Sequence, residues 1–114
     1  MTTLAPLPWG DAAVYTVDVS VSIAGKTLIF VAKHSTTDAD PAAIITKRTG
    51  AGIAHTDEAN GIAEVTVLTT DTATLSPSES TVLQWAVKML DGTYPYTMLS
   101  GTLTVTPNVI RAVV

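Results

Sequence analysis

The stretch from Leu83 to Pro107 constrains the fold more than any other part of the chain, because apolar and polar residues alternate along it. Alternation at every second residue is typical of a β-strand with one buried face. Two turn signals, Asp91-Gly92 and Ser100-Gly101, divide the stretch. The pattern therefore predicts a meander of three strands.

Two longer strands are predicted upstream. Apolar residues occupy the odd positions from Val17 to Ile23, which predicts a strand from Ala13 to Ile23. The next strand, Thr27 to His34, has apolar residues on both faces, at Leu28 to Val31. Burial of both faces is typical of a central strand, or of a strand whose outer face meets a partner.

The middle of the chain supplies shorter elements. Strands are expected at 42–48, 53–55 and 62–70, with Asn60-Gly61 forming a tight hairpin. Asp71 is a candidate N-cap for a single helical turn. In total the chain is expected to be all-β, an immunoglobulin-like antiparallel β-sandwich of about 7–8 strands with one short helical turn. Trp85 is a candidate for the core tryptophan of such a sandwich.

Residues 76–90 allow two interpretations. Ser76-Pro77-Ser78-Glu79 has the form of a helix capping box, after which residues 81–90 could continue as a helix. Against a helix, Leu83, Trp85, Val87 and Met89 recur at every second position, and the run ends in a hairpin signal. The spacing favours a strand.

The chain divides into an N-terminal arm (residues 1–12), a β-sandwich domain (13–107) and a C-terminal tail (108–114). Trp9 is expected either to close the near end of the core or to anchor in a neighbouring subunit. The apolar tail is expected to add an edge strand or to dock on another subunit, because exposing it to water is costly. The predicted partner-interface residues are Leu7, Trp9, Val109, Ile110 and Val113.

The composition limits the classes of partner that are expected. Only 14 % of the 114 residues are charged and the net charge is −4, with no cluster of Lys or Arg, so nucleic acid is not an expected partner. A surface with few charges suits burial against neighbours in an assembly. There is no cysteine, which excludes disulfides and Cys-based zinc sites. The N-terminus has no signal-peptide pattern and no apolar run could span a bilayer, so synthesis in the cytoplasm without a membrane partner is expected.

No catalytic pattern is present in the sequence, so no enzyme activity and no cofactor are expected. His34 and His55 lack metal-ligand spacing, and the paired acids Asp38/Asp40 and Asp57/Glu58 are interpreted as solvated turn residues rather than calcium ligands. Tyr94 and Tyr96 stand two apart on one strand, where they could stack on a sugar or pack in an interface.

Several short segments occur in an order that resembles a module of tailed bacteriophages. They are GIAEVTVL at 61–68, DTATL at 71–75, LQWAVK at 83–88 and TMLSGTLTVTPNVIR at 97–111, preceded by TLIFVAK at 27–33 and IITK at 44–47. The order is similar to that in the N-terminal domain of upper baseplate proteins and in related small tail and fibre-attachment modules. The resemblance covers roughly residues 14 to 111.

The resemblance implies a non-enzymatic virion structural protein that works by assembling with copies of itself and with other virion proteins. Tail, baseplate, fibre-attachment or neck components all fit this expectation, and the expected location is the virion. A capsid decoration protein and a carbohydrate-binding or adhesion module are the alternatives. The family implies no catalytic residues for this chain.

Overall fold

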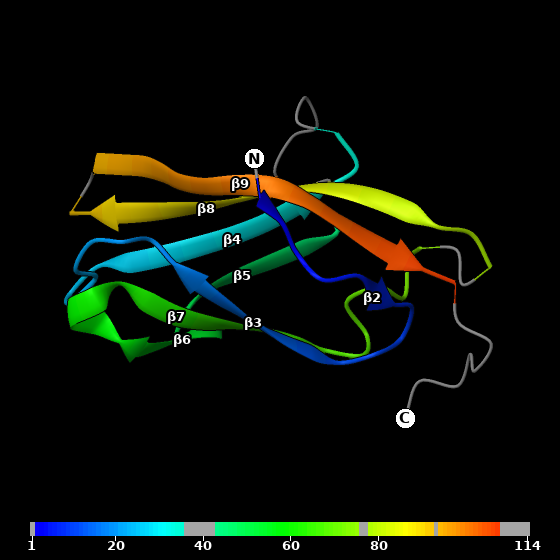
Figure 1. The fold of residues 1–114 in the computed structure, drawn as a ribbon, viewed down its shortest axis with the longest axis horizontal. Coiled ribbons are helices and arrows are strands. Elements are labelled where there is room, and N and C mark those ends of the chain that lie inside the picture. Colours follow the sequence, from blue (N-terminus) through cyan, green and yellow to red (C-terminus); the bar gives the residue numbers. More distant parts are fainter. Residues whose placement is uncertain (1, 36–42, 76–77, 93, 108–114) are drawn as a thin grey trace.

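The structure is a computed structural model that describes residues 2–35, 43–75, 78–92 and 94–107. These residues form nine strands and one 3-10 turn (Figure 1). In chain order the elements are β1 (Thr2–Thr3), β2 (Leu7–Pro8), β3 (Ala13–Asp18), β4 (Thr27–Lys33), β5 (Ile45–Thr49), β6 (Gly52–Asp57), η2 (Glu58–Asn60), β7 (Ile62–Val67), β8 (Thr81–Asp91) and β9 (Tyr94–Thr106). The predicted all-β class is confirmed.

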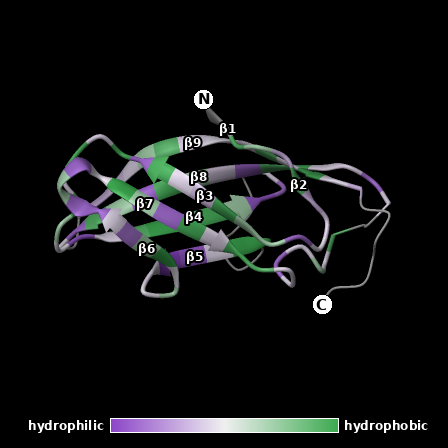
Figure 2. Cartoon of the chain, turned by 60° about the horizontal axis from the view of Figure 1, so that its bottom comes forward, coloured by the Kyte–Doolittle hydropathy of each residue, from purple (hydrophilic) through white to green (hydrophobic). Residues whose placement is uncertain are grey.

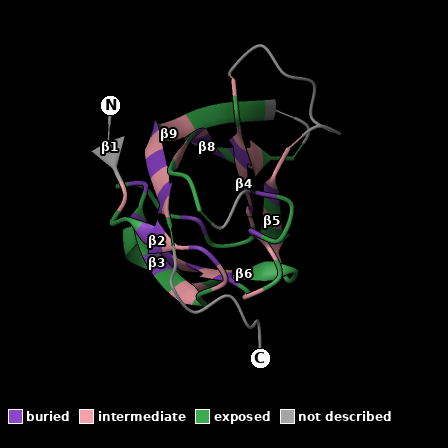
Figure 3. Ribbon diagram, turned by 90° about the vertical axis from the view of Figure 1, so that its right-hand side faces the viewer, coloured by how far each residue is buried: buried purple, intermediate pink, exposed green. Residues whose placement is uncertain are grey.

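Hydrogen bonds join the strands into one sheet with the order β1-β9-β8-β4-β5-β6-β7-β3, and β2 also pairs with β9. The link between β5 and β6 is short, since only Arg48 with Gly52 and Thr49 with Ile53 are in register. Divided there, β3-β7-β6 and β5-β4-β8-β9 follow the pairing order of immunoglobulin variable-type domains. The sheet curls around the core, with β4 and β8 on one side and β3 and β6 on the other (Figure 3).

Hydropathy alternates along the strands (Figure 2), and the apolar positions point inward. Phe30 of β4 and Trp85 of β8 stack at the centre of the core, with ring centroids 5.7 Å apart. Trp85 is therefore a core residue, which packs from β8 beside Phe30 of β4.

Two predictions from periodicity are confirmed. β4 is central, hydrogen-bonded to β5 on one side and to β8 on the other. Residues 81–91 form the strand β8 and not a helix, because burial of every second side chain from Leu83 to Met89 outweighs the capping-box signal before it. The Asp91-Gly92 hairpin also forms, with Asp91 opposite Tyr94 and Gly92 at φ 63°.

The predicted turn at Ser100-Gly101 is wrong, since β9 continues through it to Thr106. Gly101 lies directly opposite Trp85 in the β8–β9 pairing. A glycine within a strand often marks a close approach of another backbone, and Gly101 is also paired with Thr2 of β1. The indole Nε1 donates a hydrogen bond to the backbone oxygen of Thr102, 3.1 Å away. The meander therefore has two long strands rather than three.

Two boundaries also differ from the prediction. The strand from Ala13 ends at Asp18 rather than Ile23, because the Asp18 carboxylate accepts a hydrogen bond from the backbone N of Ser20, which turns at φ 63°. The helical turn lies at Glu58–Asn60 and not after Asp71. The Asp71 carboxylate instead accepts a hydrogen bond from the preceding Leu68 N, 2.7 Å away, within a series of tight turns.

The N-terminal segment is part of the folded domain. β1 and β2 pair in parallel with β9, at Gly101–Thr102 and Val105–Thr106. Leu7 is 1 % exposed and Trp9 is 8 % exposed, and both belong to the core. Trp9 Nε1 donates to the backbone oxygen of Leu75 at 3.0 Å. The prediction of Leu7 and Trp9 as partner-interface residues is corrected, because their side chains are already buried within the chain; Trp9 closes the end of the core.

Candidate interaction face

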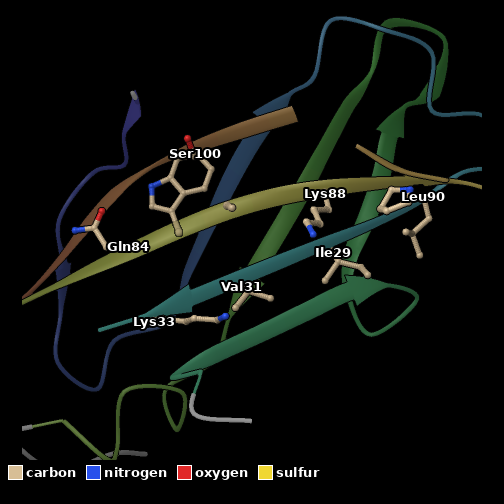
Figure 4. A pocket seen from close by; sticks show the side chains of 10 residues that line it. Ile29, Val31, Lys33, Gln84, Lys88, Leu90 and Ser100 are labelled. Atoms are coloured by element: carbon tan, nitrogen blue, oxygen red, sulfur yellow. The ribbon is translucent and has the colours of Figure 1, made fainter. Parts of the chain in front are cut away.

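The outward side of β4 and β8 forms a shallow groove that Pro95 and Ser100 of β9 border (Figure 4). We call this surface, together with the outward residues of β5, the β4–β8 face. The volume of the groove is ≈ 460 Å³. Apolar side chains that are only half-buried line its middle, and polar or cationic ones surround them: Ile29, Val31, Lys33, Gln84, Ala86, Lys88 and Leu90.

Strand register fixes the arrangement of this face. Ile29 pairs with Arg48 of β5 on one side and with Lys88 of β8 on the other, so two cations flank one apolar residue in a single row. The next row places Val31 beside Ala86. Neighbouring strands are about 4.8 Å apart, so the two cationic residues of the first row stand about 10 Å apart at their Cα atoms.

The charges on this face have one sign. Arg48 and Lys88 are exposed, and neither makes an ion pair with another described residue. No carboxylate occupies an outward position of β4, β5, β8 or β9 in the described part of the chain. By contrast, Lys47 points to the inner side and is paired with Asp71 at 2.8 Å. The β4–β8 face is therefore apolar and cationic.

A second hollow lies where the turn after β3 meets the β8–β9 hairpin, and it is more open. Tyr96 is 51 % exposed there and Lys26 lies nearby. The Tyr94 side chain, predicted to stand beside Tyr96, is outside the described residues. This hollow is lined by Val21, Ser22, Lys26, Met89, Tyr96, Thr97 and Met98.

His55 belongs to a hydrogen-bonded group at the base of β5 and β6. Its Nε2 is 2.9 Å from the Thr49 hydroxyl, and its Nδ1 is 3.7 Å from a Glu58 carboxylate oxygen. The Thr49 oxygen also accepts a hydrogen bond from the Leu28 backbone N at 2.9 Å. The order hydroxyl, imidazole, carboxylate is that of a nucleophile, base and orienting acid. However, the hydroxyl oxygen faces backbone of the neighbouring strand and lines neither hollow, so the group ties β4, β5 and η2 together.

The other residues considered from the sequence are dispersed. His34 is exposed just after β4, and Asp57 accepts a hydrogen bond from Asn60 at 2.8 Å as a turn residue. Among the residues that the structure describes, no three His, Cys, Asp or Glu side chains come together to hold a metal ion. Residues 36–42, with Asp38 and Asp40, and the tail with Val109, Ile110 and Val113 lie outside the described residues.

No protein-family model matches the chain, and no curated protein is similar to it. Function is therefore inferred from the fold and from the β4–β8 face. The sequence predicts the apolar part of this face, because apolar residues on both sides of the strand at 28–31 indicate an outer face that meets a partner. It does not signal Lys88 and Arg48, which only the strand register brings to either side of Ile29. Within the described residues, no helix has the length and apolar character needed to cross a membrane.

Proposed function

We propose that this chain is a non-enzymatic structural protein of a tailed bacteriophage virion, a component of the tail, baseplate, neck or fibre attachment that acts by assembling with itself and with other virion proteins. The observation that carries the proposal is the β4–β8 face. Ile29, Val31 and Leu90 present apolar surface to solvent at the middle of a rigid sheet. Such surface is stabilised when another protein covers it.

Two further features support this role. The order of short segments along residues 14 to 111 resembles baseplate and tail modules. The charges are few, and a continuous hydrogen-bonded sheet with a mostly neutral surface suits a part that is held in place by its neighbours. A virion location after synthesis in the host cytoplasm is part of the proposal.

The test is to raise antibodies against the purified chain and to search for it in phage particles released by the strain that encodes it. Immunoblots of gradient-purified particles should contain the chain in many copies, and immunogold electron microscopy should place it on the tail or baseplate. Label on the head would indicate the alternative, a capsid decoration protein. Absence from particles, with the chain present in the cell lysate, would contradict a virion role.

The C-terminal tail retains its proposed role as an assembly element. Val109, Ile110 and Val113 are apolar, and a chain that lacks residues 108–114 is expected to fold but not to assemble. Circular dichroism checks the fold of the truncated chain, and native mass spectrometry checks its assembly. An unfolded truncated chain would mean that the tail belongs to the core instead.

Tyr96 favours a second candidate function, a carbohydrate-binding or adhesion module. Its ring is half-exposed at the edge of a hollow that also contains Lys26, and an exposed aromatic ring can stack on a sugar. A glycan array probed with the native chain and with Tyr96→Ala tests this. Binding that is lost in the variant would support the adhesion role, and no binding to the array would count against it.

A further inference from the structure

The side of the molecule opposite the β4–β8 face has the opposite charge. Its outward positions are those of β3, β7 and β6, and we call it the β3–β7 face. Its charged residues are Asp18, Glu64 and Asp57, the last of which a register shift in β6 places opposite the outward Ile62, and no Lys or Arg occupies an outward position of these three strands. The other outward residues are apolar or neutral: Val14, Thr16, Ala54, Thr56, Ile62 and Thr66.

Two of the three carboxylate residues of the β3–β7 face, Asp18 and Glu64, lie close together. Glu64 pairs with Thr16, and Asp18 is two residues further along β3, so Glu64 and Asp18 are diagonal neighbours. Diagonal neighbours in an antiparallel pair are about 7–8 Å apart. Ile62 stands directly opposite Asp18, and Val14 is 57 % exposed at the other end of β3. This face is therefore apolar and anionic.

The two faces are complementary in charge and similar in scale. Arg48 and Lys88 stand about 10 Å apart around Ile29 at their Cα atoms, and Asp18 and Glu64 are residues about 7–8 Å apart in the sheet, so long flexible cationic side chains can reach both carboxylates. Each face also offers half-buried or exposed aliphatic side chains beside its charges, Ile29 and Val31 on one, Val14 and Ile62 on the other. The net charge of −4 would make copies repel one another, but segregating the charges on opposite faces allows attraction between unlike faces.

We propose that the β4–β8 face of one copy binds the β3–β7 face of the next copy, so that the chain assembles head to tail. The proposal deepens the proposed function and rests on its premise that the protein is a self-assembling component. Because the two faces differ and lie on opposite sides of the core (Figure 3), the contact is heterologous. Repetition of one heterologous contact builds a closed ring or an open filament.

A symmetric contact is disfavoured by the same charges. Two β4–β8 faces in contact would bring Arg48 and Lys88 of both copies together, and two β3–β7 faces would bring the carboxylates of both copies together. Like charges placed opposite each other across an interface oppose association. Only the contact between unlike faces pairs cations with carboxylates.

Charge reversal on each face, followed by a swap, tests the proposal. Lys88→Glu and Glu64→Lys are each expected to weaken self-association about tenfold or more, measured by sedimentation velocity over a range of concentrations at low salt. The double variant K88E/E64K should recover most of the affinity, because it restores opposite charges at the contact. Added salt should weaken association of the native chain, because it screens exposed charges.

Matched controls reverse charges away from both faces. Lys26→Glu and Glu79→Lys make the same changes of charge at sites outside the two faces and are expected to leave association unchanged. Circular dichroism melts check that all variants fold.

Three outcomes would overturn the inference: a native chain that stays monomeric, association that survives both reversals, or weakening by Lys88→Glu without any effect of Glu64→Lys. The last outcome would mean that the β4–β8 face binds a different acidic site on the neighbouring copy. If the chain is nevertheless found in purified particles, only the head-to-tail contact fails and the virion role stands.

Discussion

The centre of the sheet and the end of the core that the N-terminal segment closes are both tightly packed, but they are built in different ways. At the centre, Trp85 stacks on Phe30 and its indole N–H donates to Thr102 on the adjacent strand. At the closed end, Trp9 donates to the backbone of Leu75, 66 residues away in the sequence, and Leu7 is buried with 1 % exposure.

The difference shows how the sequence determines the burial of side chains in each region. At the centre, burial follows from strand periodicity, because every second side chain of β4 and β8 points inward. At the closed end, the backbone is irregular and burial depends on hydrogen bonds between distant segments. Gly10 N donates to the Thr72 hydroxyl, and Trp9 N donates to the Thr106 oxygen. Substitutions in the two regions should therefore differ in how much they lower the free energy of unfolding and in whether they affect the whole sheet or only the closed end.

The largest effect is expected at the centre. Trp85→Ala should lower the free energy of unfolding by about 3–5 kcal/mol, because it removes the stacked ring and leaves a cavity beside Phe30. Urea denaturation followed by far-UV circular dichroism measures this, and Trp85→Phe is the control that keeps an aromatic ring. A loss below about 1 kcal/mol for the alanine variant would show that the neighbouring strands can collapse into the space.

Leu7→Ala should cost less, about 2–3 kcal/mol, because the closed end borders solvent and can relax around the lost side chain. Its effect should also be local. In a Trp85→Phe background, Trp9 is the remaining tryptophan, and its fluorescence should change at lower urea than the circular dichroism of the sheet once Leu7 is truncated. Coincident transitions would mean that the two regions unfold as one unit.

The same contrast explains what could be predicted from the sequence. Period-two alternation was enough for the all-β class, for the central position of β4 and for β8 as a strand. The turn at Ser100-Gly101 was mispredicted because a glycine inside a strand has the same local signature as a glycine that turns the chain. Only the strand pairing distinguishes the two.

The site was harder to predict for a related reason. Leu7 and Trp9 look like an apolar arm when read alone, because their partners Val105 and Leu75 are far along the chain. The cations of the β4–β8 face are likewise distant in sequence and adjacent only in register. Local periodicity says which side chains point outward, whereas it does not say which outward side chains become neighbours.

A smaller effect is expected for Thr72→Val, a substitution of similar volume at a fully buried residue of the closed end. It removes the oxygen that accepts the hydrogen bond from Gly10 N at 2.9 Å. An N–H group left without its partner costs about 1–2 kcal/mol. Urea denaturation measures the loss, and Thr72→Ser is the control because it retains the hydroxyl. Equal stability of the valine variant and the native chain would mean that this hydrogen bond does not hold the N-terminal segment in place.

The smallest effect concerns Tyr15 of β3, and it depends on pH. The Tyr15 hydroxyl donates to the Ala5 oxygen at 2.9 Å, and burial raises the pKa of its phenol. In the unfolded chain the phenol loses its proton near pH 10, whereas in the folded chain it keeps the proton to higher pH. The unfolded state then binds fewer protons, so this contribution to stability is complete below about pH 10 and declines as the pH rises further.

The substitution Tyr15→Phe separates the stability that comes from the hydrogen bond to Ala5 from the stability that depends on the ionisation of the phenol. At pH 7 the variant should be about 1 kcal/mol less stable than the native chain, because the hydrogen bond to Ala5 is lost. Above about pH 10 the difference should shrink, because only the native chain has a phenol here whose ionisation favours unfolding. Urea denaturation of both proteins at neutral and alkaline pH measures the difference. A difference that stays constant with pH would mean that Tyr15 ionises equally easily in the folded and unfolded chains, so that the closed end opens to water well before the centre of the sheet does.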